Sequence, residues 1–134
     1  MAYFDWSAKF ETGIPKIDEQ HKKLVSLINE LYEAMLKGQG KESMGVVLNA
    51  LAEYTQYHFS TEEAAFKKYG YPNAAPHAIM HQAFIAKVGD WIDKQKRGSL
   101  VISVEVLEFL TTWIKNHIQK EDMQYVPTLS GKAI

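Results

Sequence analysis

Apolar side chains recur every three or four residues in four separate stretches of the chain, a period that is typical of amphipathic helices. The first stretch runs from Asp18, a candidate N-cap, to Gly38, which suits a helix C-terminus. The second lies beyond Gly40 and is stopped by Gly70 and Pro72. No stretch shows the two-residue alternation of a half-buried strand.

The third and fourth stretches carry similar start and stop signals. The third begins after Asn73, tolerates Pro76 in its first turn, and ends near Arg97. The fourth has Ser103 as a candidate cap and closes before Pro127. Four amphipathic helices joined by short loops predict an all-α fold, an up-down-up-down antiparallel four-helix bundle.

The remaining residues divide the chain into three parts. Residues 1–17 are aromatic-rich and irregular, so we expect an N-terminal arm anchored on the bundle by Trp6. The bundle domain then covers 18–126, and 127–134 form a C-terminal tail.

Composition excludes several classes of protein. Hydrophobic residues make up 46% and charged residues 23% of the chain, as in ordinary folded domains. The net charge of −1, with no long run of one sign, excludes a nucleic-acid partner. No apolar run is long enough for a membrane span, and the N-terminus lacks a signal peptide, so we expect a cytoplasmic protein. The exposed faces show no large apolar stripe, which favours a monomer.

The histidines are the first candidates for chemistry. All five fall on the predicted helices, on or beside an apolar stripe. His58 lies four residues before Glu62, and His77 and His81 repeat this spacing, which places both members of each pair on one helix face. Since the chain has no cysteine, any metal must bind through nitrogen and oxygen.

Chain direction decides whether these side chains can meet. In an up-down bundle the start of the first helix, the end of the second, the start of the third and the end of the fourth share one end. His21 and His77 are early in their helices, whereas His58 and His117 are late. The histidines are therefore expected to converge at one level of the core.

One histidine on an apolar stripe is most often an ordinary core or boundary residue. A cluster of histidines and carboxylates without a metal, however, would leave several polar groups competing for few partners in the interior. Seven potential ligands exceed the needs of one ion, so the pattern predicts two metals, with iron, zinc, copper and nickel all open. On an ideal helix the carboxylate that joins His117 is Glu121, because Asp122 is turned away from that face.

Several strings in the sequence carry a family resemblance. They are IDEQH at 17–21, HFSTEE at 58–63, Tyr71-Pro72, HAIMH at 77–81, and WIKNHI at 113–118 continuing through Asp122. Together they resemble the hemerythrins, specifically the single-domain bacterial kind, from Trp6 to about Tyr125. The resemblance implies two iron ions joined by an oxygen bridge.

The resemblance also implies a ligand for each position. One iron would be held by His77, His81 and His117, the other by His21 and His58, with Glu62 and Asp122 bridging. The family pattern thus favours Asp122 over Glu121, which requires the end of the fourth helix to loosen or to contain a wide turn.

The implied function is reversible binding of molecular oxygen at the open position of the iron held by His21 and His58. Such a protein is a carrier and not an enzyme, and it would serve oxygen storage, transport or delivery to an oxygen-consuming enzyme. The side chains of Trp113, Ile114 and Ile118 would form an apolar oxygen pocket that excludes water.

Other functions remain alternatives. A di-iron oxidase or peroxidase of the ferritin type uses Glu-x-x-His pairs, and the sequence contains none. A two-metal hydrolase needs an open polar cleft, whereas this site is expected among apolar core residues. An oxygen or redox sensor, or an iron store, would use the same residues.

Overall fold

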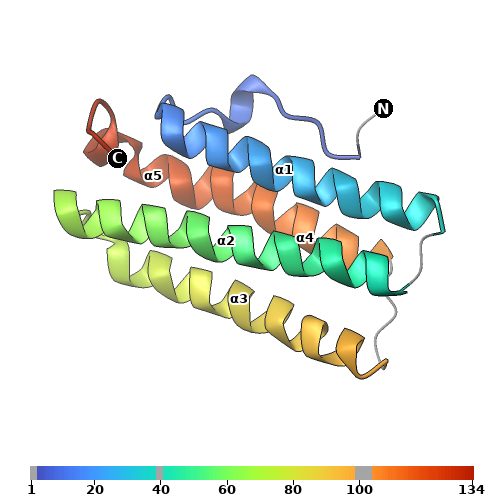
Figure 1. Ribbon diagram of the computed structural model, residues 1–134. Helices are drawn as coiled ribbons and strands as arrows, with labels where there is room; N and C mark the ends of the chain where they lie inside the picture. Colours follow the sequence, from blue (N-terminus) through green and yellow to red (C-terminus); the bar gives the residue numbers. More distant parts are fainter. Residues whose placement is uncertain (1–2, 39–40, 99–103) are drawn as a thin grey trace.

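The computed structural model describes residues 3–38, 41–98 and 104–134, and helices account for most of them (Figure 1). In chain order the elements are η1 (Ala8–Phe10), α1 (Pro15–Leu36), α2 (Lys41–Tyr69), α3 (Ala74–Lys96), α4 (Val104–Asn116), the π-helical turn η2 (His117–Asp122) and α5 (Met123–Leu129). These residues contain no strand, and α4, η2 and α5 follow one another as the fourth helix of the bundle. The predicted all-α four-helix bundle is confirmed.

The helices are arranged so that the parts of the chain that carry the predicted ligands meet at one end. α1 packs against α2 and α4, and α2 packs against α3. Figure 1 shows the start of α1, the end of α2, the start of α3 and the junction of α4 with α5 together at the left of the bundle. The N-terminal segment runs over the outside of α1, and η1 contacts η2. This is the convergence that the helix directions predict.

Two predicted helix ends are confirmed by glycines in the left-handed region. Gly38 has a φ of 64° two residues after the end of α1, and Gly70 has a φ of 70° directly after α2. Glycine adopts this conformation without the steric cost of a Cβ atom. α3 ends at Lys96, next to the predicted end near Arg97. Gly40 and Ser103 lie outside the described residues.

The prediction that Asp18 caps the first helix is wrong. α1 begins at Pro15, a favoured first helical residue because its missing N–H would have no partner there. The Asp18 carboxylate instead turns back to the preceding loop, where it accepts hydrogen bonds from the Thr12 amide (2.8 Å), the Thr12 hydroxyl (2.7 Å) and the Gly13 amide (3.1 Å). The carboxylate therefore holds the entry of the chain into the helix.

The prediction that the last helix closes before Pro127 is also wrong. α5 continues through Pro127 to Leu129, although a proline removes one intrahelical hydrogen bond. Tyr125 and Leu129 are both fully buried in this segment, and the burial of two large side chains offsets the lost bond.

The buried apolar residues form two clusters with a polar layer between them. The main cluster fills the length of the bundle, and the smaller one, which contains Ile17, Phe66 and Tyr125, closes the end where the four helices meet. Along α1, for example, Ile17 belongs to the small cluster and Leu24 to the main one, with His21 between them. On α1 the site residue therefore lies between two apolar regions.

Among the described residues, the exposed large apolar side chains do not gather on one helix. The exposed large apolar side chains are spread over four helices; they are Leu36, Val46, Tyr57, Ile79 and Val104. No helix in the described part of the chain is both long enough and apolar enough to cross a membrane. The monomer stays a prediction.

Replacing Asp18 with alanine removes three hydrogen bonds to an ionised acceptor, so we expect the free energy of unfolding to fall by about 1–3 kcal/mol. Urea unfolding of the metal-free protein measures the change. Its neighbour Glu19 is exposed on the same helix, and Glu19→Ala should change the stability by less than about 0.5 kcal/mol. Equal effects of the two substitutions would contradict this role for Asp18.

Candidate metal centre

The structure brings all seven predicted ligand side chains together in the polar layer, and none is more than 6% exposed. Their candidate ligand atoms fall into two groups, and within each group all atoms lie within 4.8 Å of one another. One group is Glu62, His77, His81 and His117; the other is His21, His58, Glu62 and Asp122. Glu62 belongs to both groups, so the two groups adjoin.

In the first group three imidazole nitrogens face a common point. His117 Nε2 lies 3.0 Å from His77 Nε2 and 3.1 Å from His81 Nε2, and Glu62 Oε1 lies 3.2 Å from His81 Nε2. Nitrogen atoms bound at about 2.1 Å to one ion, at right angles to each other, are about 3 Å apart. The observed separations match the edge of such a coordination shell.

The second group is formed by side chains from three elements. His21 Nε2 lies 3.0 Å from Asp122 Oδ2, and His58 Nε2 lies 3.4 Å from Glu62 Oε1. The rings of His21 and His58 meet edge to face with their centroids 4.6 Å apart. This group therefore offers two imidazoles and two carboxylates.

Asp122 lies across both groups. Its Oδ1 atom is 3.1 Å from His77 Nε2 and 3.2 Å from His117 Nε2, while its Oδ2 atom is 3.0 Å from His21 Nε2. A carboxylate that presents one oxygen to each side has the geometry needed to bridge two ions.

The π-helical turn η2 explains how Asp122 reaches this position. In an α-helix a residue five places after His117 points away from it, whereas a π-helical turn pairs residues five apart and so returns Asp122 to the same face. Glu121, the candidate on ideal helix geometry, lies outside the cluster and lines a surface groove. The wide turn that the family resemblance requires is present.

The cluster fits a metal because several of its polar atoms have no other partner. Both ring nitrogens of His21, Glu62 Oε1 and both carboxylate oxygens of Asp122 are buried without a hydrogen bond. His21 Nε2 is near Asp122, but the contact is not directed as a hydrogen bond. An unpaired buried polar atom costs about 1–3 kcal/mol, which a bound cation would remove. A set of imidazoles and carboxylates suits iron, zinc, copper or nickel.

Ionisation also favours metal binding at part of the cluster. Burial lowers the pKa of His58 and of His117 to about 4, against the pull of nearby carboxylates. Both imidazoles are therefore neutral at pH 7, the form that binds metals. Burial opposes ionisation of Asp122, but His117, His21 and His77 hold its pKa well below its ordinary value.

His21 and His81 behave differently. Burial lowers the pKa of each imidazole, but Asp122 beside His21, and Glu62 and Glu63 beside His81, outweigh it, so both pKa values lie above the ordinary value. A carboxylate beside an imidazole favours its protonated form. A metal that binds His21 or His81 must therefore displace a proton from that imidazole.

Three side chains that contact the cluster were missed in the sequence. Gln20 Oε1 lies 2.6 Å from His58 Nδ1, Glu63 Oε2 lies 2.8 Å from His81 Nδ1, and the Tyr125 hydroxyl donates to Glu62 Oε2 at 2.6 Å. Each partner comes from another helix, so no local spacing identifies it. In the sequence, Gln20 and Glu63 stand out only because each is adjacent to a predicted ligand, His21 or Glu62. This adjacency does not reveal that they contact His58 and His81 on other helices.

Aromatic rings cover two of the histidines. Phe59 stacks on His81 with centroids 3.7 Å apart and an interplanar angle of 3°. Trp113 stacks on His117 at 4.3 Å and 13°. The two rings limit the rotation of these imidazoles and shield them from water.

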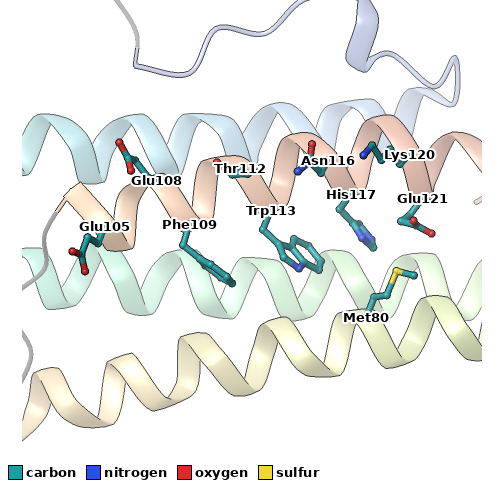
Figure 2. Close-up of a pocket in the computed structure, with 10 residues that line it drawn as sticks. All are labelled: Met80, Glu105, Glu108, Phe109, Thr112, Trp113, Asn116, His117, Lys120 and Glu121. Carbon is teal, nitrogen blue, oxygen red and sulfur yellow. The ribbon is translucent and has the colours of Figure 1, made fainter.

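The predicted oxygen pocket has one half-buried member and two buried ones. Ile114 and Ile118 are each 2% exposed in the main apolar cluster, while Trp113 lines a groove of about 570 Å³ together with His117. Figure 2 shows Phe109, Trp113 and His117 in a row along one side of the fourth helix, with Met80 of α3 across from His117. The groove leads from the surface to one side of the cluster, and the role of the three residues in binding oxygen stays a prediction.

Known proteins share both this sequence pattern and this fold. The family model described as "Hemerythrin HHE cation binding domain" matches residues 12–129. A bacteriohemerythrin of Pseudomonas aeruginosa is 36% identical over 128 residues, covering 94% of this chain and 81% of the relative. A bacteriohemerythrin of Methylococcus capsulatus is 33% identical over 132 residues, covering 98% of this chain and all (100%) of the relative.

A solved structure adds the fold to this comparison. The crystal structure of wild-type hemerythrin superposes with a TM-score of 0.93 at 31% sequence identity, covering 97% of this chain and 100% of that one. The sequence match, the fold and the buried cluster agree, and the chain belongs to the hemerythrin family.

Proposed function

We propose that this protein binds molecular oxygen reversibly at a non-haem di-iron centre. The observation that carries the proposal is the pair of adjoining ligand groups, which share Glu62 and lie in a layer between two apolar clusters. Membership of the hemerythrin family supports iron as the metal.

The proposed ligands divide unequally between the two ions. One ion would be held by His77, His81 and His117, and the other by His21 and His58, while Glu62 and Asp122 would serve both. The ion with two imidazoles would have fewer protein ligands, which would leave room for a small ligand. When bound, the iron pair supplies two electrons to oxygen and takes them back on release.

The surrounding side chains control what reaches that position. Tyr125 donates a hydrogen bond to Glu62 Oε2, and burial raises its pKa well above the ordinary value, so it remains a donor at pH 7. Ile114 and Ile118 keep the neighbouring core apolar. Exclusion of water and protons favours return of intact oxygen over further reaction.

The ligand set favours a carrier over an oxygen-activating enzyme. Five imidazoles and two carboxylates leave less negative charge than the carboxylate-rich sites of ferritin-like enzymes, which stabilise more oxidised iron. We infer a use in oxygen storage, transport or delivery to an oxygen-consuming enzyme, by a monomer. A sensor or an iron store is the alternative that the same site allows.

The first test is an optical spectrum of the iron-loaded protein. After anaerobic reduction we expect a visible charge-transfer band to appear with oxygen and to fade under argon, with two irons for each chain. A band that never forms, or oxidation that argon does not reverse, contradicts reversible binding. Steady turnover of a reductant would favour the oxidase alternative instead.

The neighbours Asp122 and Glu121 form a matched pair for testing the ligand assignment. Asp122→Asn keeps the size of the side chain but removes the charge between the two groups. We therefore expect fewer than two irons to remain bound to each chain. Glu121→Gln changes a groove residue and should leave the iron content unchanged. Iron analysis after gel filtration measures both, and full iron content in Asp122→Asn would contradict the assignment.

The oxygen pocket can be tested through Ile114. Ile114→Thr puts a hydroxyl group in a buried apolar site, and we expect the oxygenated protein to autoxidise several-fold faster because water and protons reach it more easily. Val106→Thr is a matched control, since Val106 is also buried in α4 but is early in the helix. Optical spectra recorded over time give the autoxidation rate of each variant. An unchanged rate in Ile114→Thr would contradict a role for this residue in the pocket.

A further inference from the structure

We infer that Glu63 and Gln20 are positioning residues that make the two metals unequal, Glu63 through His81 and Gln20 through His58. The inference rests on the proposed function, because it concerns the reduction potential of iron at this site. It assigns roles to two residues outside the seven proposed ligands.

The first observation concerns Nδ1 of the histidines, the ring nitrogen that faces away from the cluster in His58 and His81. In the described part of the chain, only His58 and His81 have a hydrogen bond through Nδ1 to another side chain: His58 to Gln20 at 2.6 Å and His81 to Glu63 at 2.8 Å. The Nδ1 atom of His21 is buried without a partner. Under the proposed assignment, each metal would therefore have one histidine ligand whose orientation is fixed by a hydrogen bond at Nδ1.

The orientation of the Gln20 amide is set by a chain of hydrogen bonds. Its Nε2 donates to the Thr61 hydroxyl at 3.3 Å, and that hydroxyl donates to the Tyr57 carbonyl at 3.1 Å. The Oε1 atom of Gln20 must then be the one that faces His58, and it accepts the Nδ1 proton. This arrangement leaves His58 Nε2 without a proton and directed at the cluster.

Glu63 acts on His81 in the same way but with a charge. Its side chain is 41% exposed, and its Oε2 atom accepts a hydrogen bond from His81 Nδ1. Phe59 stacks on the same ring, so His81 is held by a face contact and an edge contact. The neighbouring residue Glu62 meets the other nitrogen of His81, at 3.2 Å.

A carboxylate and an amide behind an imidazole have different consequences for a metal. Both acceptors fix the tautomer, but the carboxylate also draws the Nδ1 proton towards itself and makes the imidazole a stronger electron donor. A stronger donor stabilises the more highly charged ferric ion and lowers its reduction potential. Glu63 therefore lowers the potential of the iron bound by His81, and neutral Gln20 leaves the other iron without this effect.

The experiment compares Glu63→Gln with wild type in the full-length iron-loaded protein. Glutamine keeps an acceptor oxygen for His81 but removes the charge, so we expect a midpoint potential of the iron pair to rise by about 59 mV, a tenfold change in a one-electron equilibrium. Gln20→Glu adds a charge behind His58 and should shift a midpoint downwards. Spectroelectrochemistry measures both, and Glu53→Gln, an exposed change on α2, serves as the control with no shift.

The outcomes separate this inference from the proposed function and from a purely structural role. If wild type does not bind two irons, the proposed function fails and the inference with it. If wild type binds iron and oxygen but neither Glu63→Gln nor Gln20→Glu moves a midpoint, only the inference is overturned. A purely structural Glu63 would leave the midpoints of Glu63→Gln unchanged and show its effect only in Glu63→Ala, as a loss of iron affinity of about 10- to 100-fold.

Discussion

Burial of a charged and polar layer near one end of an apolar bundle is the constraint on which the structure depends. Five imidazoles and two carboxylates lie between two apolar clusters, and several of their atoms lack any hydrogen bond. Apolar residues of similar size would pack here at less cost, so the layer weakens the metal-free fold. Two bound metal ions, one in each group of ligand atoms, would satisfy these atoms together.

The same constraint explains the irregular fourth helix. His117 and Asp122 are five residues apart, and both must face the layer. An α-helix cannot meet this demand, while a π-helical turn can, at the expense of regular hydrogen bonding. The regular helix resumes at once in α5, where Tyr125 is buried and bonds to Glu62. The packing beyond the turn thus helps to hold a conformation that the backbone alone disfavours.

The sequence predicted the parts of this site that follow from position along a helix. The spacing of His58 and Glu62, together with the early or late position of each histidine in its helix, predicted that these side chains lie at one level of the core. Geometry alone chose Glu121 over Asp122, because an ideal period cannot reveal a π-helical turn. Asp18 was misread for a similar reason: a carboxylate near a helix start can bond the loop before it as well as the helix amides. Gln20 and Glu63 were missed because their partners lie on other helices.

The two halves of the layer differ in their access to water, and this difference bears on the proposed chemistry. On one side Glu63 is partly exposed and His117 lines a surface groove. On the other side His21 and His58 are at most 1% exposed, and His21 has no hydrogen-bond partner at all. Under the proposed assignment, the ion with the free position lies on the dry side. Oxygen that must be released unchanged is best bound where protons are scarce. The Glu63 carboxylate, whose charge would help to balance an oxidised iron pair, lies instead at the exposed edge, where solvation lowers the free-energy cost of its charge.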